Sequence, residues 1–247
     1  MAVAPPDRIL VIRALGLGDL LTAVPALRGL RRAYPRSVIT LAAPGGLRPL
    51  LETIVREYVA QGFRRFYLAV NYKAEQIESH FGDGSALGAT IFYLRERERL
   101  GTAGPLSLLP QKPTEPIVVT NGDLLTREDY GDMVDRHIAS GADATMAVRD
   151  YEMQVPYGVV RERDGAIEAI EEKPIQRFVV SAGMYVLSPE AIELVPSNTY
   201  FDMPTLFETL ARLGKRTRCH AIDGYWLDIG RATDYEKAKS DFTELFP

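Results

Sequence analysis

The sequence has 247 residues, of which 46% are hydrophobic and 25% charged, and its formal net charge is −4 at pH 7. These values are ordinary for a globular protein and do not indicate a nucleic-acid-binding protein. The length allows one large α/β domain or two small ones. The single cysteine, Cys219, excludes an intramolecular disulfide and is typical of a reducing compartment. Neither a membrane-spanning apolar run nor a signal-peptide pattern occurs, so we expect a cytoplasmic protein.

Strands and helices are predicted to alternate through the first half of the chain. Short apolar runs predict strands at 8–13, 37–43, 66–70, 89–93 and 116–120. Apolar residues at helical spacing predict helices at 20–30, 50–58, 74–80 and 128–139. Because this alternation is typical of parallel strands joined by helical crossovers, we expect a mostly parallel sheet covered on both faces.

The pattern changes after residue 140, where strands follow one another with few helices between them. Strands are predicted at 144–148, 158–163, 166–172 and 179–187, and helices at 204–213 and 231–245. The dipeptide Asp164-Gly165 indicates a two-residue hairpin. We therefore expect an antiparallel or mixed extension of the sheet, and one continuous α/β domain over residues 1–247.

Asp123 is the first candidate for chemistry, because it follows the strand at 116–120 in a sharp Asn121-Gly122-Asp123 turn. In open parallel sheets, ligands bind beyond the carboxyl ends of the strands, where an aspartate can bind Mg²⁺. The same residues are also good cap chemistry for a following helix. The turn alone leaves both alternatives open.

Asp228 is the second candidate, in the segment Gly-Tyr-Trp-Leu-Asp-Ile-Gly at 224–230. An aspartate between apolar residues is costly to bury without a partner or an ion. A surface turn is an equally weighted alternative. If the two aspartates meet, they can hold one metal ion on a nucleoside triphosphate.

Lys173 and Glu172 end a predicted strand in the sequence Glu-Glu-Lys-Pro. A lysine there suits a phosphate, and a glutamate can accept hydrogen bonds from sugar hydroxyls. For a lone lysine, a solvated strand end is the favoured alternative. Glycine-rich turns at 100–104 and 156–158 would let a ligand approach the backbone. Three histidines lack a metal-ligand spacing and are interpreted as structural: His80, His137 and His220.

Nine stretches follow one another in the order GGLRPLLETIV, NYKAEQIESHFGDGSALG, ERLGTAGPLSLL, VVTNGD, VPYGVV, EEKP, SAGMYVL, YFDMPTLFE and GYWLDIGRATDY. From about Gly45 onward, they resemble nucleoside-diphosphate-sugar pyrophosphorylases, such as mannose-1-phosphate guanylyltransferases and glucose-1-phosphate thymidylyltransferases. The resemblance implies a Rossmann-like three-layer α/β sandwich of the nucleotide-diphospho-sugar transferase type, with a mixed, mostly parallel sheet. It also implies that an NTP and a sugar 1-phosphate react to give an NDP-sugar and pyrophosphate.

The resemblance further implies a role for each matching residue. Asp123 and Asp228 would bind Mg²⁺, and with Lys173 they would form the catalytic set. Lys173 would contact the sugar phosphate and Glu172 the sugar. The remaining substrate-binding positions would lie near the base or in the turn before Asp123 (Gly101 and Gly122) or around the sugar (Gly158, Ser181 and Gly183).

The N-terminal end departs from this family, which begins with a strand, a glycine-rich loop bearing an arginine, and a Pro-Lys-Pro segment. Residues 8–44 instead resemble the start of a family 9, heptosyltransferase-like glycosyltransferase, in which Asp19 would be the catalytic base. The chain is therefore interpreted as a fusion, either natural or an engineered chimera. Gly45, Gly46 and Arg48 would partly replace the missing phosphate loop.

Three functions are weighed on these grounds. The leading hypothesis is a Mg²⁺-dependent nucleotidyltransferase whose activity is reduced by the missing loop. The second is a non-catalytic sugar-nucleotide binding or regulatory module, and the third is a glycosyltransferase that uses Asp19. We expect residues 8–44 to form a strand–helix–strand unit within the same sheet, with the strand at 37–43 in the family's first-strand position. A homo-oligomer is compatible with the sequence.

Overall fold

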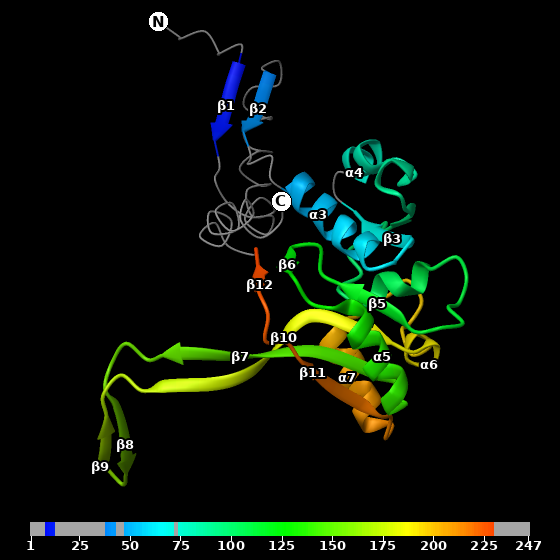
Figure 1. Ribbon diagram of the computed structural model, residues 1–247. Helices are drawn as coiled ribbons and strands as arrows, with labels where there is room; N and C mark the ends of the chain where they lie inside the picture. Colours follow the sequence, from blue (N-terminus) through cyan, green and yellow to red (C-terminus); the bar gives the residue numbers. More distant parts are fainter. Residues whose placement is uncertain (1–7, 13–37, 43–46, 72–73, 230–247) are drawn as a thin grey trace, which may run out of the picture. The chain divides into compact units, whose positions relative to one another are not determined.

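The computed structural model describes residues 8–12, 38–42, 47–71 and 74–229 (Figure 1). The chain divides into two compact units. The first unit comprises Met1–Glu98, Asn121–Glu128 and Tyr225–Pro247, and the second comprises Arg99–Thr120 and Asp129–Gly224. The predicted helices at 20–30 and 231–245, and the residues Asp19, Gly45 and Gly46, lie outside the described residues. The expectation of one continuous domain stays a prediction.

The described part of the first unit contains three pairs of strands and two helices. Strand β1 (Arg8–Ile12) pairs in parallel with β2 (Val38–Ala42), and β3 (Arg65–Val70) pairs in parallel with β4 (Thr90–Arg95). Strand β6 (Leu124–Thr126) pairs antiparallel with β12 (Trp226–Asp228). The helices are α3 (Leu47–Ala60) and α4 (Ala74–Phe81), and a short 3₁₀ turn, η1 (Ser85–Leu87), precedes β4. Strands β1 to β4 confirm the sequence prediction.

The pair formed by β1 and β2 tests the prediction for the N-terminal segment in part. Its parallel register, with Arg8 opposite Val38 and Ile12 opposite Ala42, is the one expected for a strand–helix–strand unit. Among the strands that the structure describes, neither β1 nor β2 pairs with a third. The place of this pair within a larger sheet therefore stays a prediction.

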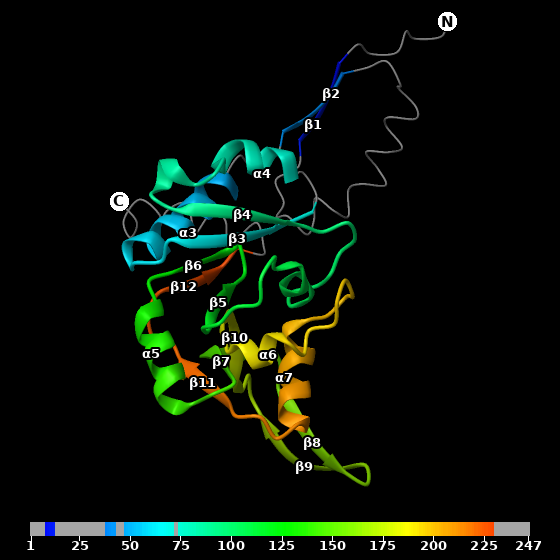
Figure 2. The same ribbon diagram turned by 90° about the vertical axis from the view of Figure 1, so that its right-hand side faces the viewer.

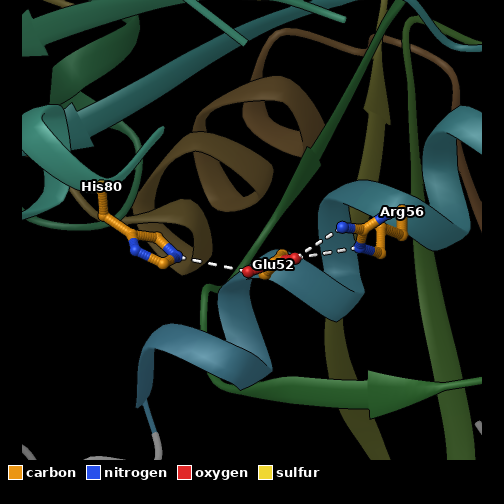
Figure 3. Close-up of polar contacts among 3 residues, drawn as sticks. All are labelled: Glu52, Arg56 and His80. Atoms are coloured by element: carbon orange, nitrogen blue, oxygen red, sulfur yellow. Dashed lines mark hydrogen bonds and ion pairs between the residues drawn. The ribbon is translucent and has the colours of Figure 1, made fainter. Parts of the chain in front are cut away.

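Helices α3 and α4 are joined by a small polar cluster on the surface of the first unit (Figure 3). Glu52 on α3 accepts two hydrogen bonds from Arg56, at 3.0 and 2.7 Å, and its other oxygen lies 3.3 Å from Nε2 of His80 on α4. The hydrogen bond from Arg56 lowers the pKa of Glu52. On the buried side of α3, the ring of Tyr58 packs edge-on against Phe63 and Phe66.

The second unit is built on a mixed four-stranded sheet in the order β11-β7-β10-β5. These strands are β5 (Ile117–Thr120), β7 (Ala144–Gln154), β10 (Ile175–Leu187) and β11 (Thr217–Ala221). Strand β10 is antiparallel to both β7 and β5, whereas β11 is parallel to β7. The mixed extension predicted after residue 140 is confirmed, although β11 was not predicted.

Helices cover both faces of this sheet at the end where Ala144 of β7 pairs with Leu187 of β10 (Figure 2). Helix α5 (Tyr130–Ser140) packs on the face that carries Thr145, and α7 (Met203–Arg212) packs on the opposite face, where Tyr185 contacts Phe207. The short helix α6 (Pro189–Ile192) follows β10, and the 3₁₀ helix η2 (Gly104–Leu108) precedes β5. The core under α7 consists of fully buried apolar side chains, among them Leu187, Met203, Leu206 and Leu210.

Strands β7 and β10 continue beyond the helices and end in the hairpin of β8 (Val159–Arg163) and β9 (Ala166–Glu171). The predicted Asp164-Gly165 turn is present, with φ angles of 52° and 81°. Positive φ at both positions is the geometry that a two-residue hairpin requires, and it explains the glycine. None of the helices in the described residues is long and apolar enough to cross a membrane.

A buried histidine links α5 to the sheet of the second unit. His137 is 1% exposed, with Nδ1 2.8 Å from Oγ1 of Thr145 and Nε2 3.0 Å from Oγ of Ser188. Because the Ser188 hydroxyl donates to the carbonyl of Ala142, it must accept from Nε2–H. Nδ1 then accepts from Thr145, so the neutral ring is fully hydrogen-bonded. Burial lowers the pKa of His137, and the charge of Asp143 opposes this shift only in part.

We predict that His137 makes the free energy of unfolding fall as pH decreases. The unfolded chain takes up a proton near the ordinary histidine pKa of about 6.5, whereas the folded chain resists it, so stability is lost below that pH. His137→Gln, which keeps a donor and an acceptor but does not titrate, should lose less stability between pH 7.5 and 5.5 than the wild type in urea titrations. His80→Gln is the surface control. A wild-type pH dependence in His137→Gln would contradict the assignment.

Candidate active site

The two candidate aspartates are brought together by the pairing of β6 with β12 in the first unit. Asp228 lies opposite Leu124, the residue after Asp123, and the amide of Ile229 donates to the carbonyl of Asp123 at 2.9 Å. The Thr126 hydroxyl donates to the carbonyl of Tyr225 at 2.8 Å and closes the other end of the pair. Residues 124–126 are buried, and their packing holds the adjacent turn that carries Asp123 in place.

The two carboxylates interact electrostatically. Burial raises the pKa of Asp123, and the negative charge of Asp228 raises it further. Asp123 is half-buried and Asp228 exposed, so the pair borders solvent. A carboxylate whose ionisation is opposed by burial and by a second carboxylate beside it marks a place where a cation would be stabilised.

The neighbours of Asp123 exclude the helix-cap alternative that the sequence left open for this residue. Asp123 is followed by β6 and not by a helix, and the N-cap of α5 is Asp129, whose side chain accepts from the amide of Asp132 at 2.9 Å. Asp228 is the exposed last residue of β12, and because the chain from residue 230 lies outside the described residues, the surface-turn alternative stays open for it. Neither β6 nor β12 was predicted.

The donor set fits Mg²⁺. Magnesium is usually held by one or two carboxylates together with substrate phosphates and water. The described residues contain no group of three or more His, Cys, Asp or Glu side chains that could hold a metal by themselves. Of the residues that the structure describes, Asp123 and Asp228 would be the ligands, and substrate phosphates and water would supply the other oxygens.

The remaining positions predicted in the first unit are only partly described. Arg48 lies in the first turn of α3, and a Cβ atom at Gly122 would lie 3.8 Å from Cδ1 of Leu51, also on α3. That distance is an ordinary contact, so the packing does not by itself require a glycine at position 122. Helix α3 thus runs beside the turn that carries Asp123.

In the second unit, the structure brings Gly158, Glu172 and Lys173 together at the base of the β8–β9 hairpin. A Cβ atom at Gly158 would lie 3.0 Å from Oε2 of Glu172, so a glycine leaves room for this carboxylate. Nζ of Lys173 lies 3.7 Å from Oε1 of Glu172, and both side chains are exposed. Lys173 has a φ of 47°, an uncommon conformation for a residue with a side chain.

Ser181 and Gly183 lie in an irregularity of β10. The register with β7 shifts between Ser181 and Tyr185, and Gly183 has a φ of 73°. The Ser181 side chain accepts from the amide of Gly183 at 3.3 Å, and its oxygen lies 3.2 Å from the hydroxyl of Tyr185. A bulge in a strand commonly re-aims a side chain beside a functional site.

Sequence reasoning missed Thr102 and Asp202, which fix the turn that contains Gly101. The Asp202 carboxylate accepts from the amide and hydroxyl of Thr102, at 2.9 and 3.2 Å, and from the hydroxyl of Tyr200 at 2.6 Å. The Thr102 hydroxyl in turn accepts from the amide of Met203, the first residue of α7, at 2.8 Å. In the sequence, only the residue types pointed to this contact, because threonine and aspartate are both common N-caps of helices.

The same packing gives a reason for the glycine at position 101. Gly101 has a φ of 80°, and a Cβ atom there would lie 2.6 Å from Oδ1 of Asp202 and 2.8 Å from the carbonyl oxygen of Phe201. The glycine is therefore required by the contact with residues 201–202. A contact between this turn and a nucleotide base stays a prediction.

We predict that Asp202→Ala lowers the free energy of unfolding by about 1–3 kcal/mol, because it leaves the donors of Thr102 without their acceptor. Tyr200→Phe, which removes one hydroxyl and keeps the carboxylate, should cost only about 0.5–1.5 kcal/mol. Urea titrations of the two variants beside the wild type measure both values. An Asp202→Ala variant as stable as Tyr200→Phe would show that the Thr102 contacts contribute little.

We predict that Mg²⁺ raises the unfolding temperature of the wild type, with a stabilisation of about 2.7 kcal/mol at a concentration of 100 times Kd. Asp123→Asn and Asp228→Asn should each abolish this increase, while Asp135→Asn, an exposed control on α5, should retain it. Metal-free Asp228→Asn should be at least as stable as the wild type, because it removes a like charge beside Asp123. Equal metal responses in all four proteins would exclude the site.

Comparisons with known proteins identify the family of the chain. The profile of the nucleotidyl transferase family matches residues 31–244. Mannose-1-phosphate guanylyltransferase catalytic subunit beta of Drosophila pseudoobscura pseudoobscura is 32% identical over 220 residues, which are 85% of this chain and 57% of that protein. D-glycero-alpha-D-manno-heptose 1-phosphate guanylyltransferase of Aneurinibacillus thermoaerophilus is 32% identical over 201 residues, covering 81% of this chain and 87% of that protein.

The fold is shared with a solved structure. HddC from Yersinia pseudotuberculosis superimposes with a TM-score of 0.60 at 24% identity, over 78% of this chain and 84% of that one. The α/β fold of the nucleotide-diphospho-sugar transferase type is thus confirmed. The chain spans 57% of the length of the Drosophila relative, and the family match begins within the segment 8–44. The glycosyltransferase-like origin of that segment stays a hypothesis. The chain belongs to the nucleotidyl transferase family.

Proposed function

We propose that this protein is a Mg²⁺-dependent nucleotidyltransferase that joins an NTP to a sugar 1-phosphate and releases pyrophosphate. The observation that carries the proposal is the meeting of Asp123 and Asp228, two carboxylates from distant segments, where β6 pairs with β12. Membership of the nucleotidyl transferase family supports the same reaction class.

The reaction makes clear why these residue types are needed. A phosphate oxygen of the sugar 1-phosphate attacks the α-phosphorus of the NTP, and the bond from that phosphorus to the bridging oxygen of pyrophosphate breaks. Both reactants are anions, so positive charge must offset their repulsion. It must also keep the attacking oxygen in line with the bond that breaks. A bound Mg²⁺ ion would supply much of that charge. Asp123 and Asp228 would hold it, and Lys173 would bind the sugar phosphate.

The names of the relatives support a narrower substrate class. One acts on mannose 1-phosphate and the other on a manno-heptose 1-phosphate, and both are named guanylyltransferases. We therefore propose GTP and a manno-configured sugar 1-phosphate as the preferred pair. Exposed Glu172, next to Gly158, is a suitable acceptor for sugar hydroxyls.

The second candidate is a binding module that keeps the sugar-nucleotide site without turnover. It is favoured by the sequence at 8–44, which lacks the family's arginine-bearing glycine loop and Pro-Lys-Pro segment. Without cations beside the β- and γ-phosphates, pyrophosphate departs slowly. We accordingly propose that turnover is reduced, with Gly45, Gly46 and Arg48 as partial substitutes for the loop.

A pyrophosphate-release assay with Mg²⁺, each of the four common NTPs and a panel of sugar 1-phosphates tests the proposal. The expected result is release that depends on both substrates and is fastest with GTP and mannose or manno-heptose 1-phosphate. Asp123→Asn and Asp228→Asn should each lower kcat by at least about a hundredfold, and the double variant should be little worse than either single one. Binding of GDP-mannose without pyrophosphate release would favour the binding module.

We predict that Lys173→Ala weakens sugar 1-phosphate binding about tenfold or more but changes NTP binding little, because the charge faces the sugar phosphate. Isothermal titration of each ligand separately measures the two affinities. Lys112→Ala, which removes a surface lysine paired with Glu193, is the matched control and should change neither. An equal loss of affinity for both ligands would contradict the assignment of Lys173 to the sugar phosphate.

A further inference from the structure

Strands β6 and β12 carry the candidate metal site, but their apolar residues do little to fix how the two strands pair (Figure 2). Each strand has three residues, and among the described strands this pair joins no third. Leu124 and Leu125 are both buried, so β6 lacks the alternation of apolar and polar residues that usually fixes a register. A slip of one residue would carry Asp228 to the opposite face of the pair and change its distance from Asp123. The register therefore depends on another contact.

The side chain of Thr126 supplies that contact. Its hydroxyl donates to the carbonyl of Tyr225 at 2.8 Å and accepts from the amide of Glu128 at 3.2 Å. The same carbonyl accepts from the amide of Arg127 at 3.3 Å, so main chain and side chain together close this end of the pair. A threonine hydroxyl is both a donor and an acceptor, and backbone groups use both capacities here.

Burial makes these hydrogen bonds costly to lose. Thr126 is 4% exposed, so a slip that broke its contacts would leave polar groups without partners in a region with little water. A slip of one residue would move the carbonyl of Tyr225 by about 3.3 Å along the strand, which is beyond hydrogen-bond reach of the hydroxyl. The Thr126 hydroxyl therefore penalises the slipped register, which the apolar residues of β6 do not.

The contact is held from both sides. Nε2 of Gln61, the residue after α3, donates to the carbonyl of Glu128 at 3.0 Å, so the partner of Thr126 is itself fixed. At the other end of the pair, the amide of Ile229 donates to the carbonyl of Asp123 at 2.9 Å. That bond needs the same register. Asp228 lies between the two closed ends, so its position depends on both.

We propose that Thr126 is a positioning residue, whose hydroxyl fixes the register of β12 and thereby holds Asp228 beside Asp123. The inference rests on the proposed function, in which these two aspartates are the ligands of Mg²⁺. It extends the site by a side chain that contacts neither the metal nor a substrate. Loss of a group that orients metal ligands typically lowers metal affinity by about ten- to a hundredfold.

Substitutions at position 126 test this role through Mg²⁺ affinity, measured from the rise of the unfolding temperature with MgCl₂ concentration. Thr126→Val and Thr126→Ala, which lack the hydroxyl, should each bind Mg²⁺ about ten- to a hundredfold more weakly. Thr126→Ser restores the hydroxyl and should bind like the wild type. The matched control is Thr145→Val, which removes another buried threonine hydroxyl, in the second unit, and should lose stability but keep the affinity.

Hydrogen exchange in the metal-free protein tests the register without a ligand. The amide of Ile229 should exchange about tenfold faster in Thr126→Val and Thr126→Ala than in the wild type, the serine variant or the control, because its bond to Asp123 needs the register. This measurement also separates the two proposals. If the wild type does not bind Mg²⁺, the metal site is wrong, and the exchange of Ile229 alone decides the role of Thr126.

Three results would overturn the proposal. The first is a folded valine or alanine variant with the Mg²⁺ affinity or the Ile229 exchange rate of the wild type. The second is a serine variant that behaves like the alanine variant, because the methyl group would then be what matters. The third is failure of both the valine and the alanine variant to fold, which would show that the hydroxyl serves the fold as a whole.

Discussion

The hydrogen-bonded pairing of β6 with β12 is the interaction on which the candidate site depends. Each strand has only three residues, and about a hundred residues of chain separate them. The pair places two carboxylates side by side and buries the residues beneath one of them. Burial and like charge both oppose the ionisation of Asp123. A fold that holds two such groups together stores an electrostatic cost that a bound cation would relieve.

A second constraint shapes the glycine turn at residues 101–104. Its conformation is set by two polar side chains. The Thr102 hydroxyl accepts a hydrogen bond from the amide of Met203, the first residue of α7, and the Asp202 carboxylate accepts one from the amide of Thr102. Asp202 therefore does not cap its own helix but holds a loop a hundred residues away in sequence. A substrate bound at this turn would meet backbone whose position is already fixed, so little conformational entropy would be lost on binding.

The sequence predicted most of the regular elements because their apolar periodicity is long enough to recognise, as in α3, α7 and β10. Three-residue strands carry no usable period, so β6 and β12 were not predicted, and the surroundings of Asp123 and Asp228 could not be described before the structure. Asp123 could still be recognised as a candidate, because an apolar strand runs directly into a sharp turn there. The roles of Lys173 and Glu172 were predicted from their motif and stay predictions, whereas the contact between Thr102 and Asp202 depends on tertiary structure alone.

The most direct test of the central claim is the titration of the Asp123 carboxyl group in the metal-free protein, followed by carbon-13 NMR and assigned by the signal missing from Asp123→Asn. If the two carboxylates lie together, the pKa of Asp123 is above the ordinary aspartate value in the wild type and falls in Asp228→Asn, where one of its causes is removed. The same pKa in both proteins would contradict the pairing of the carboxylates and, with it, the proposed metal site.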